Sequence, residues 1–166
     1  MEGVNIRNLF GKYRGTVKDN NDPNRQGRIE VEVPSVFGEG GSAWAMPCVP
    51  YAGNGLGFLA LPEIDADVWV EFMDGDSECP IWVGCFWRDR GTTPLDPYNP
   101  EKKILKTNIG AITLDDNSGS GGIIIETADG MKIEIKSSGI EITNGQAKIK
   151  MEGRSVSIND GALEIT

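Results

Sequence analysis

A run of short repeats at the C-terminal end constrains the fold more than any other feature of this chain. From Gly122 the sequence reads GIIIETAD, GMKIEIKSS, GIEITN, GQAKIKME, GRSVSIND and GALEIT, so a glycine opens every unit. Apolar residues stand two apart inside each unit, and a unit has the length of one short strand and one turn. The repeats therefore predict a winding or meandering β structure rather than a globular core.

A ribbon of such short strands has one apolar face and nothing in its own sequence to cover it, and isolated hairpins are marginal in water. A solenoid formed by one chain is the alternative. Such a solenoid needs about three strands per coil, so the six units would form only about two coils, whereas a repeat array needs three or more stacked units to be stable. We therefore expect three identical ribbons to face one axis in an intertwined trimer. The predicted trimer core consists of Ile123, Ile125, Ile133, Ile135, Ile140, Ile142, Ile149, Met151, Val156, Ile158, Leu163 and Ile165.

The region before residue 95 follows a different pattern, with short strands of uneven spacing between turns. Apolar and polar residues alternate over residues 28–33 and 67–73, which predicts strands with one buried face. Five or six such strands suit a small closed barrel. The chain is predicted to be all-β, with a barrel domain and N-terminal extension over 1–95, a proline-rich linker over 96–103 and the repeat domain over 104–166. The expected strands of the barrel are 13–18, 28–33, 45–49, 58–61, 67–73 and 81–86.

Composition and charge exclude several functions. The chain carries a net charge of −9, which disfavours nucleic acid as a partner because such binding needs Lys and Arg to neutralise phosphates. The N-terminus has no basic start followed by an apolar segment, so we expect folding in a cytoplasm. Cys48, Cys79 and Cys85 show no CxxC spacing and sit among apolar neighbours. They are interpreted as reduced core cysteines.

The acidic stretch FMDGDSECPIWVG is the main candidate for a catalytic site. Asp74, Asp76 and Glu78 could form an acid and base pair, but glycine and serine beside them predict an exposed hairpin tip without separated pKa values. The chain has no histidine, which excludes Ser-His-Asp triads and the common zinc sites. Asp115 and Asp116 do not match a calcium loop either. We expect no catalytic residue, no cofactor and no bound metal.

Four tryptophans could offer a platform for sugars or bases. Trp69 and Trp82 are expected to face outward across one hairpin, where a partner protein is an equally good explanation.

Several motifs, in order, resemble one known family. They include GRIEVEVPS, the Trp-opened strand AWAMP, the turn AGNGLGF, the strand VWVEF and the hairpin GDSECPIWVG. Over residues 11–88 the chain resembles the OB-fold domain of type VI secretion Vgr spikes and of phage baseplate assembly protein V. The passage from Leu105 to Ile135 resembles the entry of such proteins into a trimeric β-helix. Asp65 stands where the family often has glycine, and Ala111 replaces a common histidine.

The resemblance implies an N-terminal OB-fold barrel followed by an intertwined trimeric β-helix or β-prism. It implies a non-enzymatic homotrimeric central spike, in the baseplate of a virion or injection particle assembled in the cytoplasm. The spike would contact a separate hub protein at the end of the tail tube, a PAAR-like tip protein at its C-terminus, and the target envelope that it pierces. A trimeric OB-fold carbohydrate-binding module and an envelope depolymerase remain the alternative functions.

Overall fold

The computed structural model describes residues 9–95 and 97–165, and the chain divides between Arg90 and Gly91 into two compact units. Residues 1–8 of the predicted N-terminal extension, Asp96 of the predicted linker and Thr166 lie outside the described residues. Nearly all of the regular secondary structure in both units is β-strand, as predicted. In the described part of the chain, no helix has the length and apolar character needed to cross a membrane.

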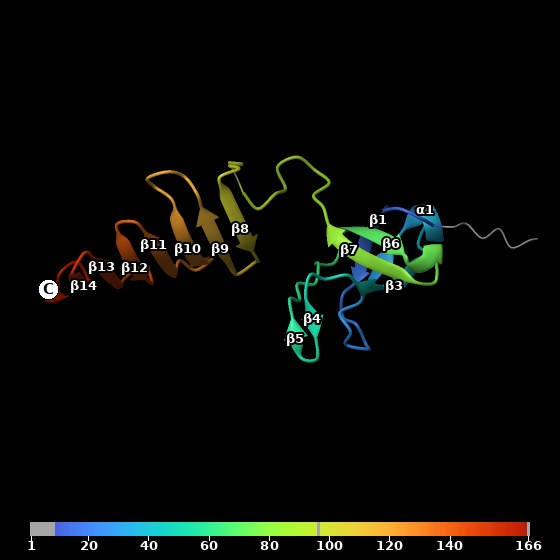
Figure 1. Cartoon of the computed structure of the whole chain (residues 1–166), viewed down its shortest axis with the longest axis horizontal. Coiled ribbons are helices and arrows are strands. Elements are labelled where there is room, and N and C mark those ends of the chain that lie inside the picture. The colour runs from blue at the N-terminus through green and yellow to red at the C-terminus, as the bar shows by residue number, and fades with distance from the viewer. Residues whose placement is uncertain (1–8, 96, 166) are drawn as a thin grey trace, which may run out of the picture. The chain divides into compact units, whose positions relative to one another are not determined.

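The N-terminal unit is a closed barrel of five strands in the order β1-β2-β3-β7-β6 (Figure 1). β1 pairs antiparallel with β2 and with β6, and β3 pairs with β7 in parallel. A four-residue helix, α1, follows β2, and a 3-10 turn, η1, lies between β6 and β7. The elements are β1 (Tyr13–Asp19), β2 (Ile29–Glu32), α1 (Pro34–Phe37), β3 (Ser42–Pro47), β6 (Asp67–Phe72), η1 (Met73–Gly75) and β7 (Pro80–Cys85).

The predicted alternation in the barrel strands is confirmed. Ile29 and Val31 in β2, and Val68 and Val70 in β6, are fully buried, while the residues between them are half-buried. Side chains of successive strand residues point to opposite faces, so each strand contributes every second residue to the interior. The barrel core comprises Leu9, Val17, Ile29, Val31, Val33, Ala45, Val68, Val70, Phe72 and Trp82.

One expected barrel strand is wrong. Residues 58–61 are not in a strand, and the barrel closes through β1 and β6 without them. The preceding residues instead form a separate hairpin of β4 (Ala52–Gly53) and β5 (Leu56–Gly57). Its turn is the pair Asn54 and Gly55, and Gly55 has the positive φ of 70° that such tight turns require.

The loop between β1 and β2 is organised by one buried carboxylate. Asp22 accepts hydrogen bonds from the backbone N–H groups of Asn24 (2.9 Å) and Gln26 (2.7 Å), and from the Arg28 guanidinium through Nε (3.1 Å) and Nη2 (2.7 Å). The Arg28 bond, aided by the backbone N–H groups, holds the pKa of Asp22 well below its usual range. Arg28 also lies 5.4 Å from the ring centre of Trp44, so this loop is fixed against the outside of the barrel.

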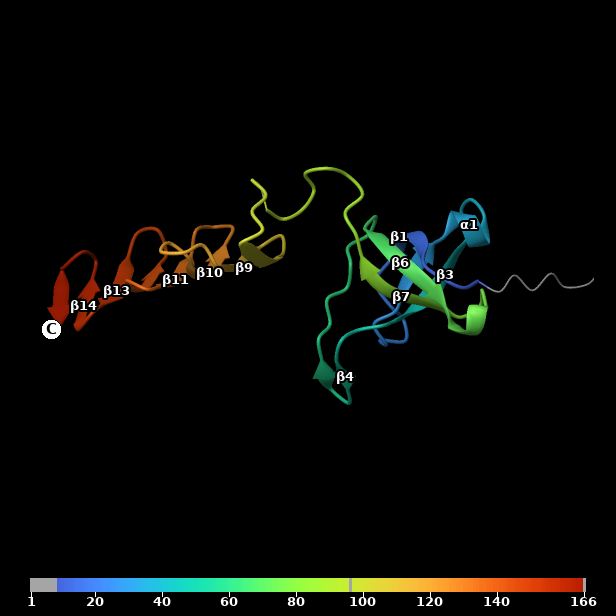
Figure 2. The same ribbon diagram turned by 45° about the horizontal axis from the view of Figure 1, so that its top comes forward.

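The C-terminal unit is one antiparallel sheet in which eight strands follow one another in chain order, β8 to β15 (Figure 2). The repeat glycines Gly130, Gly145, Gly153 and Gly161 occupy turns with positive φ, as the repeats predict. β8 begins at Lys102, within the last residues of the predicted linker. The strands are β8 (Lys102–Lys106), β9 (Gly110–Asp115), β10 (Gly122–Thr127), β11 (Lys132–Lys136), β12 (Gly139–Thr143), β13 (Lys148–Glu152), β14 (Ser155–Ile158) and β15 (Leu163–Ile165).

Candidate functional site

The twelve predicted core residues of the repeats form two continuous columns across the sheet. Each residue is the direct cross-strand partner of the next one in its column, so all twelve share one face of the sheet. The first column is Ile123, Ile135, Ile140, Met151, Val156 and Ile165, and the second is Ile125, Ile133, Ile142, Ile149, Ile158 and Leu163. We call this surface the apolar face.

The apolar face extends further than the repeats indicate. Leu114 is the partner of Ile123, so β9 continues the first column. Ile112 is the partner of Ile125, and Leu105 in β8 is the partner of Ile112, so both strands continue the second column. Gly110 opens β9, but the regular spacing of the repeat glycines begins only at Gly122, so these two strands were not included in the predicted core. The two-residue spacing of Ile112 and Leu114 was the available signal.

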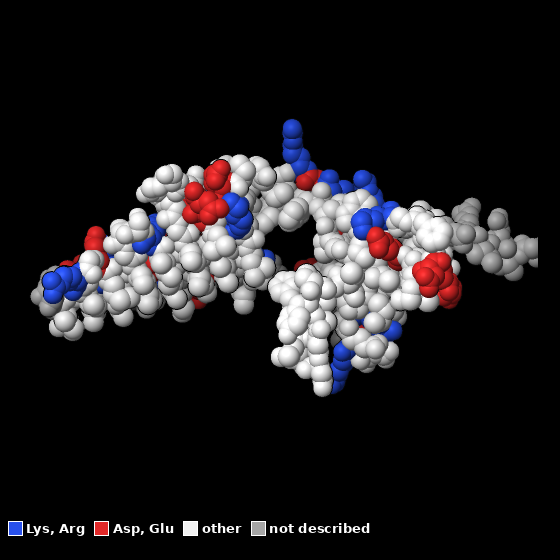
Figure 3. Space-filling model, in the orientation of Figure 1, with Lys and Arg blue, Asp and Glu red and all other residues white. Residues whose placement is uncertain are grey.

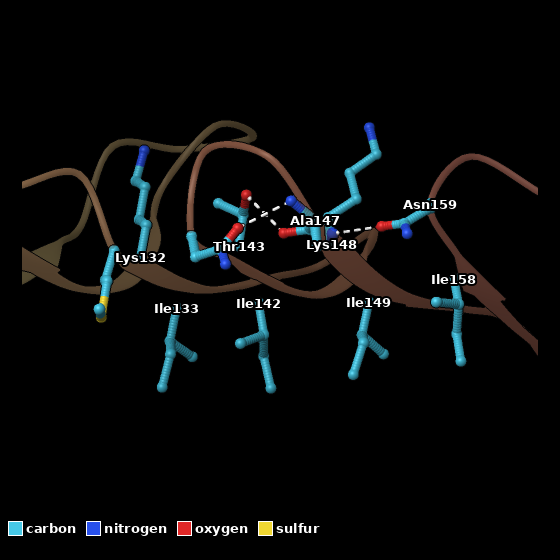
Figure 4. A pocket seen from close by; sticks show the side chains of 11 residues that line it. Lys132, Ile133, Ile142, Thr143, Ala147, Lys148, Ile149, Ile158 and Asn159 are labelled. Carbon is cyan, nitrogen blue, oxygen red and sulfur yellow. Dashed lines mark hydrogen bonds between the residues drawn. The ribbon is translucent and has the colours of Figure 1, made fainter.

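The apolar face is open in the single chain. Ile135 is 41% exposed, and the members classed as exposed range from Met151 at 37% to Ile165 at 60%. Between β11 and β14 the face is hollowed into an open groove of about 470 Å³. Figure 4 shows Ile133, Ile142 and Ile149 pointing to the same side of the sheet. A contiguous apolar surface of this extent marks an interaction site rather than an ordinary solvated face.

The turns beside this groove are fixed by side chains, which holds the strands in register. The Asn144 side-chain oxygen accepts the backbone N–H of Ala147 (2.7 Å), and the Asn159 oxygen accepts the backbone N–H of Lys148 (2.9 Å, Figure 4). The Thr143 hydroxyl donates to the carbonyl of Ala147 (3.2 Å). Because register decides which face each side chain takes, these bonds keep the two columns continuous.

The opposite face of the sheet is charged and paired. Lys132 contacts the Glu134 carboxylate at 2.6 Å and Lys136 contacts it at 3.4 Å. The Lys132 hydrogen bond is the main cause of the lowered pKa of Glu134, and Lys136 adds to it. Lys150 pairs with Glu152 at 2.6 Å, and this bond raises the pKa of the Lys150 amine. One face of the sheet is thus suited to water, whereas the other is not.

The carboxylates considered for catalysis lie at the tip between β6 and β7, and their predicted exposure is confirmed. Asp74, Asp76 and Glu78 are all exposed. Asp76 uses its side-chain oxygen to accept the backbone N–H of Glu78 (3.0 Å), an ordinary turn contact. Asp74 has a φ of 53°, a conformation that Asp adopts more readily than most residues. The arrangement explains a tight turn and provides no enclosed site for a substrate.

The acidic pair considered for calcium is engaged with other groups. Asp115 ends β9 and accepts the backbone N–H of Asn117 at 3.0 Å, which is the main cause of its lowered pKa. Lys102 lies 3.5 Å from the same carboxylate, and Asp116 pairs with Lys103. Over residues 9–95 and 97–165, no cluster of three potential His, Cys, Asp or Glu ligands is close enough to hold a metal ion.

One of the two predictions about the barrel tryptophans is wrong. Trp82 does not face outward: it is buried, and its Nε1–H donates to the carbonyl of Gly27 at 3.2 Å. The register between β6 and β7 shifts by one residue after Trp69, which places Trp82 opposite Val70 on the inner face. Trp69 does face outward and lies 4.5 Å from the ring centre of Phe86.

The interpretation of the cysteines as core residues is also wrong. Cys48, Cys79 and Cys85 are all exposed thiols, because each lies at or just beyond a strand end rather than on an inward position. Partial desolvation raises the pKa of the Cys85 thiol. Asp65, which stands where the family often has glycine, has a φ of 67°, a conformation that Asp tolerates better than most residues.

A closed five-stranded barrel joined to a sheet with an uncovered apolar face defines a class: an OB-fold domain attached to a segment that associates with further chains. Two family models match this chain. Residues 13–87 match the type VI secretion system/phage-baseplate injector OB domain, and residues 102–164 match the phage baseplate V C-terminal trimerisation domain. The chain belongs to the family of phage baseplate assembly protein V and VgrG spike proteins. The predicted family and all-β fold class are therefore confirmed.

Curated relatives support the same assignment. The chain is 34% identical over 86 residues to the actin cross-linking toxin VgrG1 of Vibrio cholerae and to the type VI secretion system spike protein VgrG2a of Pseudomonas aeruginosa, which is 49% of this chain in each case. It is 28% identical over 110 residues, or 60% of this chain, to the spike protein VgrG3 of Vibrio cholerae. The matched segments make up 8%, 10% and 11% of these relatives, respectively.

Proposed function

We propose that three copies of this chain assemble through the apolar face into the central spike of a contractile injection device. In this proposal the trimer core is made of the twelve column residues, and residues 104–166 form an intertwined β-prism. Residues 1–95 form a collar of OB-fold domains, and residues 96–103 connect the two parts. The spike acts mechanically, with no catalytic residue, cofactor or metal.

The observation that carries this proposal is the continuity of the two apolar columns. Covering a fully exposed Ile, Leu or Val side chain contributes roughly 1.5–3 kcal/mol, so each column residue gains part of that amount when another chain covers it. A family match to a trimerisation domain over residues 102–164 supports three as the number of chains. Three sheets whose apolar faces meet at one axis leave the three charged faces in water, which agrees with the ion pairs of Lys132 with Glu134 and of Lys150 with Glu152 on the outer side.

The proposed partners follow from the place of such a spike in a baseplate. The collar contacts a hub protein at the end of the tail tube, and a PAAR-like tip protein covers the end formed by β15. The trimer then pierces the envelope of the target cell. We propose the baseplate of a virion or of a related injection particle, assembled in the cytoplasm, as its location.

The first test is the mass of the full chain in solution. Light scattering is expected to give three times the 18.0 kDa of one chain, with no monomer at micromolar concentration. A monomer or a dimer would contradict the proposal. The purified trimer should also show no muramidase activity and no binding on a glycan array, since either result would favour the depolymerase or the carbohydrate-binding module instead.

A further inference from the structure

The barrel unit carries an exposed apolar segment that its own fold does not use. We call residues 50–60, which contain β4 and β5, the arm. Every residue from Tyr51 to Ala60 is exposed, and Tyr51, Leu56, Phe58 and Leu59 are 53–66% exposed. Tyr51 and Phe58 alone offer on the order of 100 Å² each, because an aromatic side chain has 150–250 Å² to bury. This is a large apolar area to leave in water.

The arm cannot hold its shape by its own contacts. Its two strands have two residues each, and they are joined by the pairs Ala52 with Gly57 and Gly53 with Leu56, together with one bond from the Phe58 N–H to the Tyr51 carbonyl (3.0 Å). A two-stranded hairpin of this size is marginal in water. A further surface that covers the apolar side chains would stabilise it.

The arm lies in the longest uncharged part of the chain. Residues 40–62 contain no Asp, Glu, Lys or Arg, although a quarter of all residues are charged and each copy carries a net charge of −9. In Figure 3 the hairpin of β4 and β5 is white, whereas charged atoms lie on other parts of the barrel. Copies with the same strong charge repel one another over most of their surface, so an uncharged surface is where they can touch most easily.

Each barrel also has a place that can receive such an arm. A groove of about 470 Å³ lies between the arm and the barrel. Arm residues 51–53 and 55–59 line one side of it, and the other side is lined by Arg25, Gln26, Gly27, Pro47 and Val49. Leu59 closes one side, since its Cδ1 lies 3.2 Å from the position that a Cβ on Gly27 would take. One chain therefore offers both an exposed apolar side chain, Leu56, and a groove that is apolar apart from Arg25 and Gln26 and to which Leu56 itself contributes. A contact of a tip with the groove of the next copy is heterologous, and it closes on itself in a ring of three.

We propose that the arm of each copy docks in the groove of the neighbouring copy and so joins the three barrels into a closed ring. This inference rests on the proposed trimer. Residues 86–101, between β7 and β8, reach at most about 55 Å when fully extended. Three barrels tethered at that distance meet at an effective concentration in the millimolar range. At such a concentration a contact of modest area is sufficient to keep the barrels associated.

Hydrogen exchange of the full chain tests the contact, with Leu56→Asp as the variant and Asn54→Asp as its control. The control adds the same charge to the same hairpin and keeps an Asp-Gly turn. We expect the amides of residues 51–60 to exchange about tenfold more slowly than an unstructured chain in the wild type and in Asn54→Asp. Leu56→Asp should lose this protection while light scattering still gives a trimer.

Photo-cross-linking identifies the occupant. A benzoylphenylalanine at position 56 should join two copies covalently, with the attachment at peptides that contain Gly27 or residues 47–49. Two results would overturn the docking while leaving the trimer intact: amides of the arm that exchange at the rate of an unstructured chain, or cross-links that stay within one chain. The apolar surface of the arm would then be a binding site for a different protein. A chain that is not trimeric would overturn both proposals.

Discussion

Replacing Ile135 by Asp is the most demanding test of the apolar face. Ile135 stands in the first column between its cross-strand partners Ile123 and Ile140, and it is 41% exposed in the single chain. Covering the remaining 41% is worth roughly 0.6–1.2 kcal/mol per chain, as the corresponding fraction of the 1.5–3 kcal/mol for full burial. Three chains therefore lose roughly 2–4 kcal/mol of burial when this side chain is removed.

The introduced carboxyl costs more than the lost burial. Three carboxylates around a dry axis repel one another and lose their hydration, so each must take up a proton to stay there. Protonating a group with a reference pKa of about 3.9 at pH 7 costs about 4 kcal/mol, since each pH unit is worth 1.36 kcal/mol. The total is roughly 12 kcal/mol per trimer, comparable to the whole stability of an ordinary domain.

Light scattering and thermal melting of the full chain measure this effect. We expect Ile135→Asp to abolish the trimer at neutral pH, and Lys136→Asp, on the charged face, to keep both mass and melting temperature near the wild type. Burial raises the pKa of the introduced carboxyl, so its cost disappears below the reference pKa and grows as pH rises. The variant should therefore regain trimer toward pH 4. The reasoning is refuted if Ile135→Asp keeps its mass and melting temperature at pH 7 and residues 1–95 alone form a stable trimer.

Three smaller predictions concern the loop, the turns and the acidic tip. Asp22→Asn should lower the melting temperature of the barrel at pH 7. The pKa of Asp22 is lower in the folded than in the unfolded chain, so the difference in melting temperature from wild type should shrink as pH falls below the pKa of about 3.9 of an unfolded Asp. Gly139→Ala should lower the free energy of unfolding by about 1–3 kcal/mol more than Gly130→Ala, which is the usual cost of overpacking. Both glycines have a positive φ, but an added Cβ would lie 2.0 Å from the Met151 carbonyl oxygen at Gly139 and would meet no atom within 4 Å at Gly130. Denaturant unfolding measures the difference. The double variant Asp74→Asn, Glu78→Gln should change stability by less than about 0.5 kcal/mol, and a muramidase activity lost in it would revive the enzyme hypothesis.

The sequence predicted those parts of the fold that depend on local features: the alternation of apolar and polar residues within a strand, and the glycines of the turns. Two-residue spacing identified the inner faces of β2 and β6 and all twelve column residues, because the pleat of a strand converts spacing directly into sides of a sheet. The glycines of the repeats predicted the turns, since few other residues adopt a positive φ without strain.

The errors arise where the outcome depends on contacts between distant segments. Trp82 was placed outside because alternation alone cannot reveal the register shift between β6 and β7. Residues 58–61 read as a strand, yet the barrel closes through β1 and β6 and leaves them out. The predicted trimer core omitted Leu105 and Ile112, because pairing between strands decides which residues continue a column and these two residues lie before the first repeat unit.

The two units differ in how many apolar side chains they bury within a single chain. Among the described residues, every buried apolar side chain belongs to the barrel unit, and in the sheet unit only Thr113 is buried. The barrel therefore has the core that an independent domain needs, whereas the sheet leaves most of its apolar side chains in contact with water. In the proposed trimer this sheet gains its missing burial from the other chains, so its folding and its association are one process. Mutations in the barrel should then change a local unfolding free energy, while mutations on the apolar face should make stability depend on protein concentration.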